Sequence, residues 1–410
     1  MSGKVGSDKN RAVVISDRGR QMPASPIRRL VPHADRAKER GVKVYHLNIG
    51  QPDLRTPAEM LAAYRNLDLE VIAYGPSGGL AAYVKGLVGY YKGEGIEVLP
   101  ADILVTTGGS EAITFVYKAI TDPGDEVIVP EPFYTNYAGY ACMNNIRLVP
   151  VTCRAEDGFH LPPRPELESK ITGRTRAILF SNPGNPTGVV YTKEEVELLG
   201  RLALDHGLFL IADEVYREFI YDKDVKHQSV LNLPGLADRA VVVDSVSKRY
   251  SACGARVGCI VSRNRELMQT VLKFGQARLC PPTVDQIAAL AALSSPPSYF
   301  EGVRDEYRGR RDIVCDALSS IPGVLCRKPE GAFYVVAKLP VDDAERFAIF
   351  MLDEFHSDNE TVMVAPANGF YATPGAGFDE ARIAYVLNQK DLKRAMDVLA
   401  RGLEAYNSRK

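Results

Sequence analysis

The stretch Leu208-Phe-Leu-Ile-Ala-Asp213 decides how the chain folds, because five apolar residues in a row lead directly to an acid. An apolar run of this kind predicts a buried strand that ends at Asp213. Similar runs occur at 103–105, 126–129, 177–180 and 240–243. Helical patterns alternate with these runs, so we expect an α/β fold with a mostly parallel sheet covered by helices on both faces.

Two local signals set the ends of helices in this alternation. Thr192-Lys-Glu-Glu195 has the spacing of a capping box, and Gly207 is placed to end the helix that it opens. Gly108-Gly109-Ser110 lies between the strand at 103–105 and a helix that we expect to continue to Ala119. Ligands of such sheets collect outside the carboxyl ends of the strands, so we expect a binding site there.

The character of the sequence changes after Ser295, where Pro296-Pro297 interrupts the pattern. A charged helical stretch, two strands and a C-terminal helix then predict a smaller α+β domain, with the first three at 299–318, 331–336 and 381–386. A chain of 410 residues is too long for one compact core, so two domains are expected. We predict an N-terminal arm at 1–29, a small domain formed by 30–58 and 298–410, and a large domain at 59–297.

Composition narrows the class of protein. A net charge of -1 and a pI of about 6.6 give no electrostatic reason to expect nucleic acid or a membrane surface as a partner. Seven cysteines without a C-x-x-C pair predict reduced thiols in a cytoplasmic protein, and six scattered histidines predict no metal site. The polar start MSGKVGSDKNR has no apolar segment, so we expect neither a signal peptide nor a membrane span, but an arm that is mobile or clasps a partner.

Four motifs in the middle of the chain carry chemically distinct groups. They are Asn185-Pro-Thr-Gly188, Asp213-Glu-Val-Tyr216, Ser245-Val-Ser-Lys248 and Arg256. A lysine amine can form a Schiff base, and a carboxylate can hold a pyridinium nitrogen charged so that the ring accepts electrons. An arginine and hydroxyl groups suit a phosphate. Together these groups predict a site for pyridoxal 5'-phosphate (PLP).

At these motifs the chain resembles the class I/II aminotransferases, in the aspartate aminotransferase-like branch of the fold-type I PLP enzymes, from Gly50 to Arg382. The resemblance implies a three-layer αβα large domain and a smaller α+β domain. It implies a homodimer that transfers an amino group between an L-amino acid and a 2-oxo acid. Glutamate and 2-oxoglutarate are the expected pair in one half-reaction, with aspartate or a neutral or aromatic amino acid in the other.

The resemblance also assigns roles to the residues of the motifs. Lys248 would carry PLP as a Schiff base and then move a proton, and Asp213 would hold the pyridinium nitrogen. Asn185 and Tyr216 would donate hydrogen bonds to the phenolic oxygen of the cofactor. The phosphate would be bound by Gly109, Ser110, Ser245, Arg256 and, from the neighbouring subunit, Tyr74.

Three further positions match ring and substrate contacts of the family. Tyr134 would stack on the pyridine ring, and Gly50 belongs to a loop that closes over the substrate. Arg382 would clamp the substrate α-carboxylate with a bidentate fork, beside Asn185. In one bacterial subgroup a lysine at the position of Ser110 pairs with the second carboxylate of the substrate, and serine cannot supply that charge.

Two alternatives stay open from the sequence. The cofactor residues do not distinguish a transaminase from another PLP enzyme, such as a carbon–sulfur β-lyase, an amino-acid oxidase or a decarboxylase, because PLP carries the chemistry. Ser245-Val-Ser-Lys248 is also an S-x-x-K motif and Ser357-Asp-Asn359 is an S-D-N, which suggests a serine acylase of the penicillin-binding type. No K-T-G follows, and the second motif lies in the charged run 356–360, for which a solvated loop is the simpler interpretation.

Overall fold

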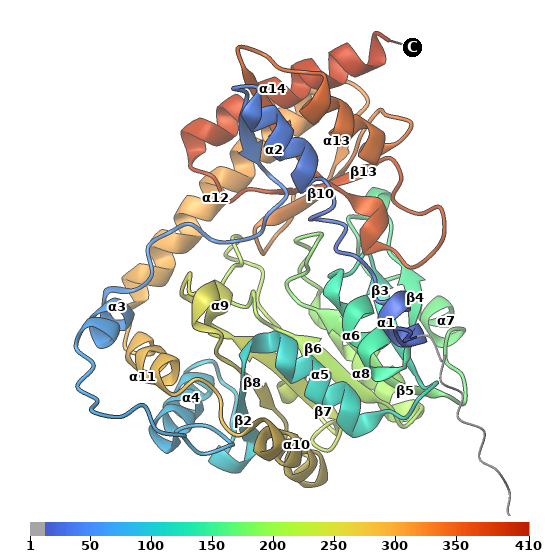
Figure 1. Ribbon diagram of the computed structural model, residues 1–410. Coiled ribbons are helices and arrows are strands. Elements are labelled where there is room, and N and C mark those ends of the chain that lie inside the picture. Colours follow the sequence, from blue (N-terminus) through green and yellow to red (C-terminus); the bar gives the residue numbers. More distant parts are fainter. Residues whose placement is uncertain (1–12, 410) are drawn as a thin grey trace, which may run out of the picture.

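The computed structural model describes residues 13–409, and in this part of the chain seven strands form the large sheet, in the order β2-β8-β7-β6-β5-β3-β4 (Figure 1). These strands are β2 Ile103–Thr106, β3 Glu126–Glu131, β4 Arg147–Thr152, β5 Thr175–Ser181, β6 Phe209–Asp213, β7 Ala240–Ser245 and β8 Gly258–Val261. Strands β3 to β7 pair in parallel, whereas β8 is antiparallel to β2 and β7. The predicted α/β fold with a mostly parallel sheet is confirmed.

The sequence predicts neither β4 nor β8, and each has a physical reason for giving a weak signal. Strand β4 lies at the edge of the large sheet, is mostly half-buried and contains Pro150, which an edge position tolerates. Strand β8 has four residues and begins two positions after Arg256, whose φ of 54° lies in the left-handed region. Strand β4 therefore lacks the apolar run that marks the central strands, and β8 is a short strand that begins with Gly258, a residue type that weakens a strand signal.

Helices cover both faces of the large sheet. Ile211 of β6 packs into the core on one face, whereas its neighbours Leu210 and Ala212 pack into the core on the other, because side chains alternate along a strand. Both faces are dry, which explains why the central strands are apolar throughout. The helices on the first face are α5 Gly108–Ile120, α6 Asn136–Asn144 and α10 Arg265–Arg278, and those on the second include α4 Ala81–Gly93, α8 Lys193–Asp205 and α11 Thr283–Ala292.

The predicted helix signals around α8 are present. Thr192 Oγ1 accepts a hydrogen bond from the Glu195 N–H (3.2 Å), and the Glu195 carboxylate accepts one from the Thr192 N–H (2.7 Å). These two bonds complete the capping box. Gly207 follows the end of α8 with a φ of +68°, a conformation that favours glycine.

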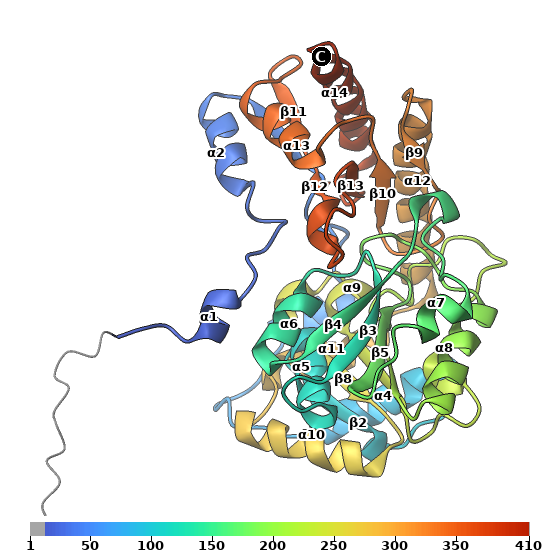
Figure 2. The ribbon, with the colours of Figure 1, turned by 90° about the vertical axis from the view of Figure 1, so that its right-hand side faces the viewer.

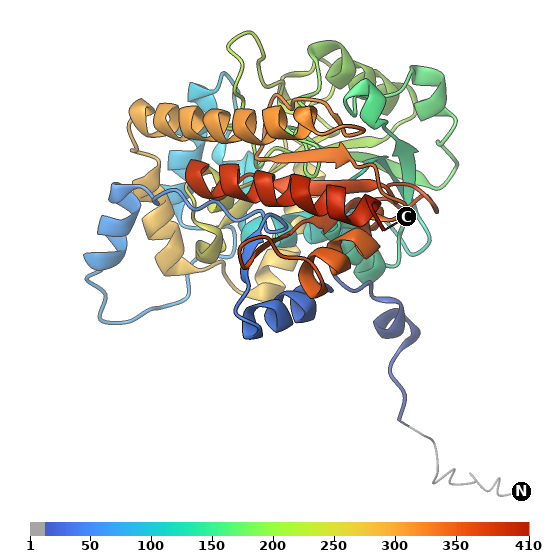
Figure 3. The ribbon, with the colours of Figure 1, turned by 90° about the horizontal axis from the view of Figure 1, so that it is seen from above.

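A second body lies above the large sheet in Figure 1. In the described part of the chain it contains a small antiparallel sheet in the order β12-β13-β10-β9 and the parallel pair β1-β11. Its strands are β1 Lys43–His46, β9 Leu325–Cys326, β10 Tyr334–Lys338, β11 Glu360–Met363, β12 Ala365–Pro366 and β13 Glu380–Ala384. Its helices are α2 Val31–Glu39, α12 Pro297–Ser320, α13 Ala344–Asp353 and α14 Gln389–Asn407, and α12 and α14 lie side by side (Figure 3).

One hydrophobic core joins the two ends of the chain in this second body. Leu30, Tyr45 and Leu47 pack there with side chains from Val303 to Leu403. The predicted domain boundaries at 30, 59 and 298 stay a prediction. The remaining short helices are α1 Asp17–Gln21, α3 Ala58–Arg65, α7 Arg164–Glu168 and α9 Val246–Arg249, with 3-10 turns at Pro100–Asp102, Ala155–Asp157, Val230–Asn232, Cys253–Ala255 and Ala367–Phe370.

The N-terminal segment crosses between the two bodies (Figure 2). Helix α1 lies against α6 beside the large sheet, where the Arg18 guanidinium donates to the Met143 carbonyl (3.4 Å), and the chain then continues to α2 in the second body. Residues 1–12 of the predicted arm lie outside the described residues, and its partner-clasping role stays a prediction. Among the residues described here, no helix has both the length and the apolar character needed to cross a membrane.

Candidate active site

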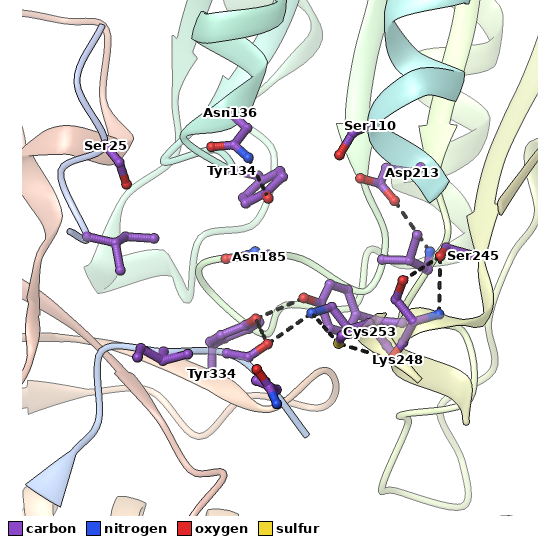
Figure 4. A pocket seen from close by; sticks show the side chains of 18 of the residues that line it. Ser25, Ser110, Tyr134, Asn136, Asn185, Asp213, Ser245, Lys248, Cys253 and Tyr334 are labelled. Carbon is purple, nitrogen blue, oxygen red and sulfur yellow. Dashed lines mark hydrogen bonds between the residues drawn. The ribbon is translucent and has the colours of Figure 1, made fainter. Parts of the chain in front are cut away.

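A cavity of about 720 Å³ opens at the carboxyl ends of β6 and β7, and Tyr334 of β10 in the second body also lines it (Figure 4). The sequence-predicted site residues, apart from Tyr74, line this one cavity. They are Gly50, Gly109, Ser110, Tyr134, Asn185, Asp213, Tyr216, Ser245, Lys248, Arg256 and Arg382. Residues that are up to 332 positions apart in the chain, from Gly50 to Arg382, therefore meet at one edge of the sheet.

Lys248 enters the cavity from α9, the short helix that begins directly after β7. Ser245 caps this helix, because its Oγ accepts a hydrogen bond from the Ser247 N–H (3.1 Å). Lys248 Nζ donates to the carbonyl of Gly50 (2.9 Å) and lies 3.7 Å from the sulfur of Cys253. Within residues 13–409 no carboxylate forms a salt bridge with Lys248, so the amine is held in place without an ionic partner.

Asp213 is the last residue of β6 and only 7% of it is exposed. Tyr137 donates its hydroxyl hydrogen to Asp213 Oδ2 (2.7 Å), and the Val215 N–H approaches Oδ1 (3.4 Å). Burial raises the pKa of Asp213 to about 6, although the hydrogen bond from Tyr137 opposes this shift. A buried carboxylate needs a cation or donors, and no described basic side chain forms a salt bridge with Asp213. The carboxylate therefore fits a cationic ligand atom.

Another part of the cavity lining suits a phosphate. Gly108 at the start of α5 has a φ of +74°, and a Cβ there would come within 2.3 Å of Arg256 Nη2. The absent side chain lets the guanidinium lie directly against the N-terminal turn of α5, where backbone N–H groups have no helical partner. Ser110 and Ser245 add hydroxyl groups to the same cavity. A helix N-terminus, an arginine and hydroxyls together match a phosphate ester.

Arg382 on β13 presents a buried guanidinium to the cavity, with only 1% of the residue exposed. Its Nη1 donates to Asn185 Oδ1 (3.1 Å) and its Nη2 to the Asn48 carbonyl (2.6 Å). Its Nε is buried and has no hydrogen-bond partner among the described residues. Burial lowers the pKa of Arg382, since no carboxylate pairs with it in that part of the chain. The guanidinium is therefore suited to an anionic ligand.

Aromatic side chains close the cavity around these polar groups. The hydroxyls of Tyr216 and Tyr334 lie 2.9 Å apart, and Tyr334 also reaches the Gly50 carbonyl (3.4 Å). A Cβ at Gly50 would overlap the Tyr334 hydroxyl at 1.8 Å, so only glycine fits there. The ring of Tyr134 meets the ring of Tyr137 edge-on, with centroids 5.5 Å apart. Its face is available to a flat ligand on the cavity side.

Three side chains with contacts in the site are missing from the sequence analysis: Tyr137, Tyr334 and Cys253. Tyr137 belongs to a tyrosine-rich stretch, Phe133-Tyr-Thr-Asn-Tyr137, and Tyr334 to the predicted strand at 331–336, so both are near residues or elements already considered. The contacts that define their roles join residues 76 and 118 positions apart, and the sequence gives no signal for these pairs. Cys253 lies five positions after Lys248, beyond the end of α9 in the 3-10 turn Cys253–Ala255, and no motif in the sequence marks it.

Two predicted elements do not lie in this cavity. Tyr74 is 80% exposed on the surface of the chain, outside the cavity of its own subunit, so its role stays a prediction. Ser357 and Asn359 of the S-D-N motif form the turn before β11, where the Ser357 and Glu360 backbones pair, and neither lines the cavity with Lys248. The geometry required for the serine acylase is therefore absent from residues 13–409, and that alternative is wrong.

The residues present fit PLP. A buried acid without a cation, an amine without an ion pair, and a helix N-terminus with an arginine correspond to the ring nitrogen, the aldehyde and the phosphate of that cofactor. The buried arginine adds a place for a carboxylate. The fold and the site thus define a fold-type I PLP enzyme that acts on a carboxylic acid.

Comparison with known proteins identifies the family. The sequence pattern of the family "Aminotransferase class I and II" matches residues 42–399. The chain is 32% identical to the aspartate aminotransferase of Geobacillus stearothermophilus over 383 residues, which cover 91% of this chain and 94% of that protein. It is 32% identical to the aspartate/prephenate aminotransferase of Thermus thermophilus over 375 residues, 89% of this chain and 92% of that protein.

Solved structures agree with this assignment. The aspartate aminotransferase from Thermus thermophilus with maleate superposes with a TM-score of 0.86 at 30% identity, covering 95% of this chain and 100% of that one. The chain belongs to the class I and II aminotransferases. It is a PLP-dependent transaminase, and the β-lyase, oxidase and decarboxylase alternatives are not supported.

Proposed function

We propose that this transaminase moves the amino group between an L-amino acid and a 2-oxo acid, with glutamate and 2-oxoglutarate as one pair. Aspartate, or a neutral or aromatic amino acid, is the partner in the other half-reaction. The buried guanidinium of Arg382 carries the proposal, since its Nε lacks a partner and it faces the cavity that holds Lys248. The names of the relatives, aspartate and aspartate/prephenate aminotransferase, support this substrate class.

Each group in the cavity has a proposed task. Lys248 would hold PLP, Asp213 its ring nitrogen, and Asn185 and Tyr216 its phenolic oxygen. The phosphate would lie against Gly109, Ser110, Ser245 and Arg256, with Tyr134 on the ring face. Arg382 would bind the substrate α-carboxylate, beside Asn185 and under the loop at Gly50.

The chemistry then follows from these positions. When bound, PLP supplies an electron sink for the pair of electrons left on Cα. Lys248 Nζ would take the proton from Cα as a general base and return a proton as a general acid. Asp213 keeps the ring nitrogen protonated, because a carboxylate in a dry site strongly favours a nearby positive charge. Tyr334 and the Gly50 backbone exclude water above the amine.

Half-reactions with a panel of amino acids test this proposal. Purified enzyme loaded with PLP should lose its yellow imine absorbance and gain the absorbance of the pyridoxamine form when glutamate is added without an oxo acid. Addition of 2-oxoglutarate should reverse the change. Glutamate that leaves the spectrum unchanged, while another amino acid converts it, would remove glutamate as a substrate and leave transamination standing.

We also propose that the active enzyme is a cytoplasmic homodimer in which Tyr74 completes the phosphate site of the partner. The exposure of Tyr74 and of the adjoining Val71 and Ile72 supports such an interface, because large apolar side chains rarely form an exposed group without a function. In the same proposal, residues 59–297 form the PLP-binding domain, and 30–58 with 298–410 form the small domain.

Hybrid dimers test the role of Tyr74. Lys248→Ala and Tyr74→Ala subunits are mixed after mild unfolding and refolding, and turnover is measured at limiting PLP. Each hybrid has one site with both Lys248 and Tyr74 intact, so the mixture should exceed the summed activity of the parents. A mixture that equals this sum, or a fully active monomer, contradicts the proposal.

A further inference from the structure

Arg28 lies on the wall of the active-site cavity that the N-terminal segment provides. Its backbone N–H donates to the Ser25 carbonyl (3.1 Å), which forms the turn between α1 and α2. Ser25, Ile27 and Arg28 line the cavity together with Asn136 and Tyr140. Figure 4 places Ser25 and Asn136 across the cavity from Lys248 and Ser245.

The segment that carries Arg28 is anchored on both sides. Before it, Arg18 of α1 donates to the Met143 carbonyl at the end of α6. After it, the Arg29 guanidinium pairs with Glu345 (2.7 Å) and Asn368 Oδ1 (2.9 Å) in the second body. Gly369 also lies so close to Pro26 that an added Cβ would come within 2.3 Å of it. The turn is thus fixed across the cavity rather than free in solution.

The cavity has more basic than acidic side chains, and Arg28 has no role in the site as proposed so far. Among the described residues that line it, four are basic and one is acidic: Arg28, Lys248, Arg256 and Arg382 against Asp213. PLP and the substrate α-carboxylate account for all of these except Arg28. In residues 13–409 the Arg28 guanidinium forms neither a salt bridge nor a hydrogen bond, whereas that of Arg29 forms both.

We propose that Arg28 binds the second acidic group of a dicarboxylic substrate and so determines specificity for such substrates. In this proposal the α-carboxylate is bound at Arg382, and the side chain of the substrate extends toward Arg28, which lines the same cavity. Ser110, which lines the same cavity, has no charge to offer. Arg28 therefore supplies from the N-terminal segment the positive charge that attracts the distal carboxylate. This inference rests on the transamination proposed above.

Substitution of Arg28 by glutamine tests the inference with two substrates. For Arg28→Gln, the ratio of kcat/KM for glutamate to kcat/KM for alanine should fall by about tenfold or more, as expected for loss of a hydrogen bond to a charged group at a partly exposed site. Arg28→Lys should retain part of this ratio, because it keeps the charge. The matched control is Arg174→Gln, which removes the same charge at an exposed position outside the cavity and away from the anchored segment, and should leave the ratio unchanged.

Calorimetric binding of unreactive acids to the PLP-loaded enzyme gives a readout that is independent of turnover. Succinate, a dicarboxylate, should bind Arg28→Gln about tenfold more weakly than it binds the unmodified chain, whereas the affinity for butyrate, a monocarboxylate, should change much less. Equal loss for both acids, or no loss for succinate, overturns the role of Arg28. An unmodified enzyme that transaminates neutral amino acids but not glutamate or aspartate overturns this inference and the choice of glutamate as a substrate, and leaves transamination standing. An enzyme that converts no amino acid overturns the proposed function as well.

Discussion

In two pairs of adjacent residues, one side chain lines the active-site cavity (the cavity side) and its neighbour belongs to a buried ionic network behind the cavity (the paired side). Asp213 and Glu214 follow each other at the end of β6, and Lys248 and Arg249 follow each other in α9. Asp213 and Lys248 line the cavity, and neither forms a salt bridge within the described residues. Glu214 and Arg249 turn away from the cavity and are fully paired. Within each pair of adjacent residues, therefore, one charged side chain has a counter-charge and its neighbour has none.

The paired side forms a buried ionic network behind the site. Glu214, which is 0% exposed, accepts hydrogen bonds from the Arg217 guanidinium and from the Val230 N–H (3.2 Å). Arg249 pairs with Asp244 (2.6 Å) and Glu218 (2.9 Å). Burial is tolerated there because every charge has its counter-charge. On the cavity side the buried groups Asp213 and Arg382 lack counter-charges, and a cofactor and a substrate would supply them.

The largest expected effect comes from removing the amine on the cavity side. Lys248→Ala should lower turnover by at least about 10⁴-fold, because the group that attaches PLP and moves the proton is lost. Thermal unfolding should change little, since Lys248 makes a hydrogen bond to a carbonyl, a contact to a thiol and a cation–π contact with the Phe333 ring at 5.9 Å, and no salt bridge among the described residues. Borohydride reduction of the unmodified enzyme should fix the mass of the cofactor on the peptide that contains Lys248. A label on another lysine would show that the assignment is wrong.

A substitution on the paired side should affect stability instead. Glu214→Gln leaves Arg217 buried without its counter-charge and should lower the free energy of unfolding by about 3–5 kcal/mol, the cost of breaking a buried pair. Urea unfolding measures the loss. Glu301→Gln, at an exposed position of α12, is the control and should change stability by less than about 0.5 kcal/mol. Similar small changes for both variants would show that the network behind the site is not a stabilising element.

Substitution of Arg382, which also lines the cavity, tests the binding of substrate rather than of cofactor. Arg382→Ala should lower kcat/KM for every amino acid by about 100-fold, about 3 kcal/mol, because it removes a charged bidentate partner of the α-carboxylate. The loss should be the same for glutamate and alanine, which both carry this carboxylate. A loss confined to glutamate would show that Arg382 binds the distal carboxylate instead.

The sequence predicts the cavity residues of this comparison better than it predicts the strands and contacts that surround them. Asp213 and Lys248 lie in motifs a few residues long, at or just beyond the ends of apolar runs that mark buried strands, so local information suffices to place them at one sheet edge. The direction of β8 depends on pairing with strands about 15 and 155 residues earlier in the chain, and no local pattern encodes it.

Contacts between distant segments set the same limit within the site. Nothing in the sequence indicates that Tyr137 would hydrogen-bond Asp213, or that Arg28 would share a cavity with residues of the central strands, because packing of whole elements decides both. For the same reason, the sequence does not distinguish the residues that line the cavity from those of the buried ionic network. Asp213-Glu214 and Lys248-Arg249 are each two adjacent residues of like charge, and only the fold gives one of each pair a partner.

The smallest effect follows from the pKa of Asp213 in the chain without PLP. Its folded pKa of about 6 lies above the ordinary value of 3.8, so the folded state binds the proton more tightly than the unfolded state does. That contribution to stability is fully present below about pH 4 and is lost as the pH rises through about 6.

Asp213→Asn has no charge to bury and can still accept the hydrogen bond from Tyr137. The variant should therefore gain stability relative to the unmodified cofactor-free chain as the pH rises, up to about 2–3 kcal/mol near pH 7.5. Urea unfolding of both chains between about pH 5 and 7.5 measures the difference, and the same comparison with PLP present should reverse its sign, because the cofactor supplies the counter-charge that Asp213 lacks. A difference that is independent of pH in the cofactor-free chain would mean that Asp213 is as well satisfied as Glu214, and the contrast between the two sides of the sheet would not hold.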